Sequence, residues 1–128
     1  MRLRWCMMAL RFRAPANGDR ILVMEREWLD LVLSGEKTLE IRAIPLRKGE
    51  TYFLGCKGHV YGSVVIADVR RLDSEEEWRA LIAGHLWERP DLPYRRTFAH
   101  SLLNLAATAV PVPYQHPRGA IGLVRFKC

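Results

Sequence analysis

The chain has 128 residues, a length typical of one domain with a single hydrophobic core. Its composition, 49% hydrophobic and 27% charged, is that of an ordinary globular protein, and no apolar run reaches the roughly 18–20 residues that span a bilayer. The formal net charge of +6 favours a polyanionic partner such as nucleic acid, but residues 1–20 contribute five arginines against one acid, which is +4 of that total. Charge alone therefore gives only weak support to nucleic-acid binding.

The first 19 residues differ in composition from the rest of the chain. They are rich in arginine and end in a turn-forming cluster, Pro15 to Gly18. We predict that residues 1–19 form a basic, disordered N-terminal extension and that residues 20–128 form the domain. An organelle transit peptide and a start codon assigned too early are the alternatives.

Cysteine and histidine residues are spaced too irregularly for a disulfide framework or a zinc site. The expected state is therefore reduced thiols in an intracellular protein, cytoplasmic or nuclear, with no metal and no cofactor. The residues concerned are Cys6, Cys56, Cys128, His59, His85, His100 and His116.

The first predicted elements lead into a short polar strand. Residues 21–24 form an apolar run typical of a buried strand, and residues 25–34 carry an apolar face with helical spacing. Gly35 follows, as expected just past a helix C-terminus, where the left-handed conformation favours glycine. In residues 38–42, polar and apolar residues then alternate, which predicts a strand with one polar face.

The rest of the chain predicts further short strands and helices. Residues 50–55 and 60–70 are rich in β-formers, and Ser74 with Glu77 has the capping-box spacing that starts a helix. We expect that helix to end before Gly84 and to be followed by a loop. The remaining expected elements are a short helix over residues 97–105 and closing strands over residues 107–112 and 120–126. This pattern indicates a small α+β barrel.

The polar face of the strand over residues 38–42 is the strongest candidate site. It places a hydroxyl, a carboxylate and a guanidinium side by side, with an ammonium at its entrance. The alternative is a solvated strand face held by a local ion pair, which contributes at most about 1 kcal/mol. The residues are Lys37, Thr38, Glu40 and Arg42.

These residues also carry a family resemblance. The segment from Leu22 to Arg42 resembles the opening of ASCH domains, which belong to the PUA-like superfamily, and its pattern G-x-K-x-x-E-x-R is filled by Gly35, Lys37, Glu40 and Arg42. The resemblance extends over residues 20–127. It implies an α+β fold, a small PUA-like β-barrel of five to six mostly antiparallel strands with two to three helices.

The resemblance implies a ligand cleft between the first helix and the barrel. RNA, a nucleotide or a modified nucleoside is the expected partner, and no membrane partner is expected. The resemblance also places the turn containing Tyr114 and His116 close to this cleft, although a turn whose histidine only caps backbone groups is the alternative. The expected ligand-binding residues are Gly35, Lys37, Thr38, Glu40, Arg42, Tyr114 and His116.

Aromatic side chains are candidates for stacking on bases. Trp87, in the predicted loop, is the best of them, while Tyr52 and Tyr61 fit a stacking or a core position equally well. Three others are expected in the core: Trp28, Phe53 and Trp78.

Two other functions remain open. One branch of the family resembles an N4-acetylcytidine amidohydrolase, and some ASCH proteins are described as ribonucleases, so Lys37 and Glu40 become catalytic candidates. The sequence departs from the amidohydrolase pattern, because Glu40 stands where a threonine is expected. The third possibility is a protein-interaction module of a transcription coactivator complex.

Overall fold

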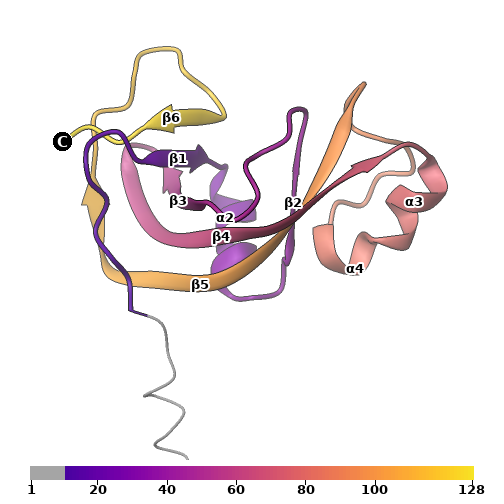
Figure 1. Cartoon of the computed structure of the whole chain (residues 1–128), viewed down its shortest axis with the longest axis horizontal. Helices are drawn as coiled ribbons and strands as arrows, with labels where there is room; N and C mark the ends of the chain where they lie inside the picture. Colours follow the sequence, from indigo (N-terminus) through magenta and orange to yellow (C-terminus); the bar gives the residue numbers. More distant parts are fainter. Residues whose placement is uncertain (1–10) are drawn as a thin grey trace, which may run out of the picture.

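The computed structural model describes residues 11–128, which form one curled sheet with helices packed beside it (Figure 1). Six strands follow the order β2-β5-β4-β3-β1-β6 across the sheet. The strands are β1 (Arg20–Val23), β2 (Leu39–Arg42), β3 (Thr51–Cys56), β4 (His59–Leu72), β5 (Thr97–Pro113) and β6 (Leu123–Arg125). The helices among the described residues are α2 (Arg26–Leu33), α3 (Glu75–Ala80) and α4 (Ile82–His85).

The two longest strands give the sheet its shape. Figure 1 shows β4 and β5 running side by side and bending strongly along their length. Among the described strands, only β1 and β3 pair in parallel, and all other neighbours are antiparallel. Within residues 11–128 no pairing joins β2 to β6, so the sheet is a half-barrel. The prediction of an α+β fold with a mostly antiparallel barrel-like sheet is confirmed.

Helix α2 covers the inner face of this sheet. Its buried residues Leu29 and Val32 belong to one apolar cluster with Leu22 of β1, Leu54 of β3 and Ile66 of β4. All five side chains are at most 2% exposed. Burial of the apolar face therefore holds α2 against the sheet, and with it the turn that follows the helix.

The turn from α2 to β2 has the predicted form. Gly35 has a φ of 85°, in the left-handed region that glycine occupies without a Cβ penalty. The N–H of Gly35 donates to Val32 O at 3.0 Å, and the N–H of Lys37 donates to Leu31 O at 2.9 Å. The chain thus reverses within three residues and enters β2 with Lys37 directed inward.

The helical segment after β4 begins as predicted but ends differently. Ser74 caps α3 by accepting from the N–H of Glu77 at 3.1 Å. Gly84, expected to stop the helix, instead lies inside α4, and the left-handed residue is Leu86 with a φ of 59°. A Cβ at position 84 would lie 2.7 Å from the side chain of Leu39, so the glycine here permits close packing of α4 on β2.

The helix predicted for residues 97–105 is wrong, because these residues begin the long strand β5. Their leucines and alanines favour a helix locally, but Thr97 pairs with Leu72 of β4, and Ala99 pairs with both Arg70 of β4 and Ile41 of β2. Two-sided pairing satisfies the backbone and overrides local propensity. The separate strand predicted for residues 107–112 is the second half of β5, and β6 is shorter than predicted.

Part of the predicted N-terminal extension contacts the domain. Phe12 meets Phe53 edge to face at 6.0 Å, and the N–H of Gly18 donates to Phe126 O at 2.9 Å. Residues 1–10, including Cys6, lie outside the described residues. Within the described part, no helix combines the length and apolar character needed to cross a bilayer.

Candidate ligand cavity

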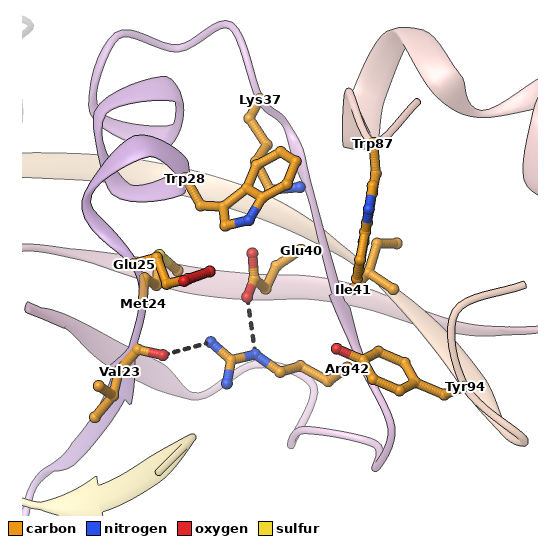
Figure 2. Close-up of a pocket in the computed structure, with 10 residues that line it drawn as sticks. All are labelled: Val23, Met24, Glu25, Trp28, Lys37, Glu40, Ile41, Arg42, Trp87 and Tyr94. Atoms are coloured by element: carbon orange, nitrogen blue, oxygen red, sulfur yellow. Dashed lines mark hydrogen bonds and ion pairs between the residues drawn. The ribbon is translucent and has the colours of Figure 1, made fainter. Parts of the chain in front are cut away.

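A cavity of about 220 Å³ opens where α2, β2 and the loop after α4 meet (Figure 2). Its floor carries charged side chains from β2 and the preceding turn, and its walls carry aromatic rings. The lining residues are Val23, Met24, Glu25, Trp28, Lys37, Glu40, Ile41, Arg42, Trp87 and Tyr94.

Lys37 is held deep in this cavity and is only 4% exposed. Its Nζ donates to the carbonyl of His85 at 2.7 Å and lies 4.8 Å from the centroid of the Trp28 ring. Burial lowers the pKa of Lys37 below its usual value, and the charge of Glu40 only partly offsets this. An ammonium has three donors, so a donor remains for a bound group.

Glu40 and Arg42 form a nearly buried ion pair on the same strand. Arg42 Nε donates to Glu40 Oε2 at 2.8 Å, and Arg42 Nη2 donates to the carbonyl of Val23 at 3.2 Å. Figure 2 shows the carboxylate of Glu40 projecting between Trp28 and the guanidinium. The pair leaves one oxygen of the carboxylate and several donors of the guanidinium for a ligand.

Aromatic rings from three parts of the chain form one wall. The centroid of Trp87 lies 5.8 Å from that of Trp28 and 6.1 Å from that of Tyr94. Trp87 also meets the buried Trp78 edge to face at 6.0 Å. These contacts fix the orientation of Trp87, which the loop alone would leave free.

Two buried histidines fix the backbone around the cavity. The ring of His85 stacks on that of Trp78, with 3.7 Å between the centroids. His85 Nδ1 accepts a hydrogen bond from the N–H of Trp87 at 2.9 Å. The proton of the imidazole is therefore on Nε2, which donates to Trp78 O. His100 accepts from the N–H of Leu46 at Nε2 and therefore donates from Nδ1 to Glu40 O. Both are 0% exposed, and burial lowers the pKa of each below its usual value. They are neutral structural clamps with no free nitrogen.

Three of the seven predicted site residues line the cavity: Lys37, Glu40 and Arg42. Gly35 shapes the turn that delivers Lys37 but does not reach the cavity. Thr38 is exposed and is not among the lining residues; its backbone N–H donates to Gly84 O at 3.0 Å.

Tyr114 and His116 lie outside this cavity. Tyr114 is buried, and burial raises the pKa of its phenol. Its hydroxyl lies 3.0 Å from His116 Nδ1, and His116 Nε2 lies 2.8 Å from the carbonyl of Ala120. His116 lines a neighbouring hollow that shares Val23, Met24 and Glu25 with the cavity. These contacts match the alternative in which the histidine caps backbone groups.

Among the aromatic candidates, Trp87 lines the cavity as predicted. Phe53 and Trp78 are in the core, as expected. The prediction of a core position is wrong for Trp28, which is only partly buried and forms the cavity wall. Tyr52 is 1% exposed, and its hydroxyl accepts from the N–H of Arg47. Tyr61 packs under the guanidinium of Arg26 at 4.6 Å.

Sequence reasoning missed Tyr94 and the carbonyls of Val23 and His85. Nothing in the local pattern marks Tyr94, because its position depends on the turn in which Thr97 Oγ1 donates to Tyr94 O at 3.0 Å.

The cavity has the size and chemistry for one flat polar group. Its volume is below the roughly 300–1,000 Å³ of pockets for drug-sized ligands and equals about seven water molecules. Two cations, Lys37 and Arg42, and two carboxylates, Glu25 and Glu40, line the cavity, so its charges balance. In residues 11–128 no three His, Cys, Asp or Glu residues lie together as a metal site.

The fold and this cavity define a small α+β half-barrel with a polar site at its first helix-to-strand turn. The ASCH domain family model matches residues 22–110, and the chain therefore belongs to the ASCH family. A search of curated proteins finds no match.

Solved structures of an ASCH protein from Zymomonas mobilis have the same fold. One of them superimposes with a TM-score of 0.68 over 86% of this chain and 88% of that chain, at 15% identity. A mutant form of that protein superimposes with a TM-score of 0.68 over 89% of this chain and 92% of that chain, at 16% identity. At this identity the likeness extends to the fold and not to individual side chains.

Proposed function

We propose that this ASCH domain binds a nucleotide, free or within single-stranded RNA, through the cavity at Lys37, Glu40 and Arg42. One observation carries the proposal. Three charged side chains lie at the floor of a hollow whose wall is aromatic. A base offers a flat face for such a wall and hydrogen-bonding edges for such a floor.

The aromatic wall supports one base from one side. The centroids of Trp28 and Trp87 are 5.8 Å apart. A ring inserted between them would need a separation of twice the van der Waals contact distance of ~3.5 Å, which is more than the structure provides. The two indoles therefore form a continuous wall, and the base packs against it with its edge toward Glu40. Stacking of this kind contributes about 1–3 kcal/mol per base.

The charged floor favours bases that carry an exocyclic amino group. The free oxygen of Glu40 accepts hydrogen bonds only, while Lys37 and Arg42 donate. Cytosine offers an amino donor beside ring acceptors, and adenine and guanine also carry amino groups, whereas uracil has none. We therefore expect uridine nucleotides to bind most weakly.

Calorimetric titration with CMP, AMP, GMP and UMP tests this proposal. Quenching of tryptophan fluorescence gives a second readout, because two tryptophans line the cavity. Lys37→Met and Trp87→Ala should each weaken CMP binding about tenfold or more. Lys127→Met is the matched control, because Lys127 is exposed and lies outside the cavity. Equal affinities for all three variants and the unmodified protein would reject the cavity as the binding site.

A hydrolase acting on RNA or a modified nucleoside is the second candidate, favoured by the buried ammonium of Lys37. Its pKa is lowered by burial, which is typical of lysines in reactive sites. Thr38 does not reach the cavity, so Glu40 would have to activate a water molecule in place of a hydroxyl nucleophile. The ion pair with Arg42 occupies one oxygen of the Glu40 carboxylate, and this favours binding over catalysis.

Incubation with N4-acetylcytidine and with labelled RNA separates the two candidates. Chromatography and mass spectrometry would detect deacetylated nucleoside or shortened RNA. Turnover that disappears in Glu40→Gln while binding persists makes the protein an enzyme with Glu40 as its base. Binding without turnover leaves Glu40 as a recognition group.

A further inference from the structure

An apolar groove adjoins the cavity. It has a volume of about 570 Å³ and a floor of Leu22 and Leu46. Seven large hydrophobic side chains are exposed among the described residues, and four of them surround this one groove: Ile44, Tyr94, Ile121 and Leu123. Ile121 is 89% exposed. A concentration of this kind marks a binding surface, because single exposed hydrophobics are normally scattered.

The groove and the cavity are continuous. Arg42 and Tyr94 line both of them, so the guanidinium and the phenol ring form the border between the two spaces. In Figure 2 the side chains of Arg42 and Tyr94 lie together at the lower edge of the cavity. A molecule that occupies the cavity and extends past Arg42 therefore enters the groove.

The charges around the groove favour an anionic occupant. Among residues 11–128 no carboxylate lines it, and its only charged lining residue there is Arg42. Arg47 directly follows the lining residue Leu46, and Arg95 and Arg96 directly follow Tyr94. In the described part of the chain, none of these three arginines forms an ion pair with a carboxylate.

We propose that the groove is the subsite for a second, adjacent nucleotide of the same single strand, an inference that rests on the proposed function. The base in the groove packs against Ile44 and Ile121, and the phosphate joining the two nucleotides lies at Arg42. A guanidinium with donors left over suits that phosphate, since it binds phosphate oxygens in a fixed fork geometry. The preferred ligand is therefore a single strand of at least two nucleotides.

The test compares a mononucleotide with a dinucleotide. CMP and the dinucleoside monophosphate CpC would be titrated against the unmodified protein, against the double variant Ile44→Ser/Ile121→Ser, and against Val110→Ser. Both groove residues are more than half exposed, so their replacement leaves the core intact. Val110 is 72% exposed and outside the groove, which makes it a matched control.

The expected result is that CpC binds the unmodified protein about tenfold more tightly than CMP. The double variant should lose this gain while its affinity for CMP stays unchanged, and Val110→Ser should keep the gain. Equal affinities for CpC and CMP in the unmodified protein, or a gain that survives in the double variant, would overturn the second subsite alone.

Failure of CMP itself to bind would instead reject the proposed function, and the second subsite with it. Analytical sedimentation of the same proteins tests the alternative occupant of the groove, a second copy of the chain. Self-association that disappears in the double variant, with no gain for CpC, assigns the groove to a second copy of the chain and overturns the nucleotide subsite.

Discussion

The turn at Lys37 and the turn at Tyr114 contain similar chemical groups but differ in what those groups contact. Each combines an aromatic ring with titratable side chains close to the barrel. Around Tyr114, the hydroxyl bonds to His116 and the imidazole bonds to a backbone carbonyl. Around Lys37, each charged side chain has one or two protein partners and faces an open cavity.

This difference shows that residue type does not identify a binding site. A polar cluster whose donors and acceptors are satisfied within the protein stabilises a turn. A cluster with hydrogen-bonding capacity left over, at the floor of a hollow, is available to a ligand. The following four predictions test this contrast in order of decreasing effect.

Removing the guanidinium of Arg42 should have the largest effect. Arg42→Ala leaves Glu40, which is 6% exposed, without its partner, and we expect a loss of about 3–5 kcal/mol in the free energy of unfolding together with weaker CMP binding. Urea denaturation and calorimetry measure the two effects. Arg26→Ala is the control, since its ion pair with Asp30 is exposed and should contribute less than about 0.5 kcal/mol. Equal losses for the two variants would contradict a special role for the buried pair.

Acid should destabilise the protein through its two clamping histidines. The pKa values of His85 and His100 are lowered in the folded state, so the unfolded chain binds more protons as the pH falls below about 6.5. Stability should decrease over this window by up to about 1.4 kcal/mol per pH unit for each histidine. Urea denaturation between pH 7.5 and pH 5 measures the slope. His85→Gln should flatten it and His59→Gln, at an exposed position, should not; an identical slope in both variants argues against the clamps.

Replacing Lys37 should raise the stability of the protein while it weakens ligand binding. The lowered pKa means that the folded state disfavours the charged ammonium, so Lys37→Met should raise the free energy of unfolding by about 1 kcal/mol at pH 7. The unmodified protein should gain stability as the pH rises from the lowered pKa toward the ordinary lysine value, and the variant should not. Thermal unfolding at pH 7 and pH 9.5 provides the measurement. A variant that is less stable than the unmodified protein at both pH values would show that the hydrogen bond to His85 outweighs desolvation.

Changing the turn at Tyr114 should have the smallest effect. His116→Ala removes two hydrogen bonds at an exposed position and should cost less than about 1 kcal/mol, with CMP affinity unchanged. The same calorimetric titration measures it. Weaker CMP binding by His116→Ala, to the degree seen for Lys37→Met, would break the contrast between the two turns and bring His116 back into the site.

Local signals predicted those parts of the molecule that local physics determines. Gly35 and the alternation after it indicated the turn and β2 correctly, because a positive φ and a pleated strand depend on neighbouring residues. The strand β5 was mistaken for a helix in its first half, because its conformation depends on pairing with Leu72 and Ile41, which are distant in sequence.

The same distinction between local and long-range determinants applies to the candidate site. Lys37, Glu40 and Arg42 are close in sequence and could be grouped without a structure. Tyr94 and Trp28 join them only through tertiary packing, and the sequence carries no sign that Trp28 faces outward from the core. The polar floor of the cavity was therefore predictable, while most of its aromatic wall was not.

Gly84 connects the packing of a helix to the proton affinity of a buried amine. Because it has no side chain, α4 lies directly against Leu39, and the carbonyl of the adjacent His85 comes within 2.7 Å of Lys37 Nζ. A Cβ at position 84 would lie 2.7 Å from the side chain of Leu39, so a larger residue there requires Leu39 or α4 to shift. The shape of the cavity and the proton affinity of Lys37 thus depend on a position that does not itself line the cavity.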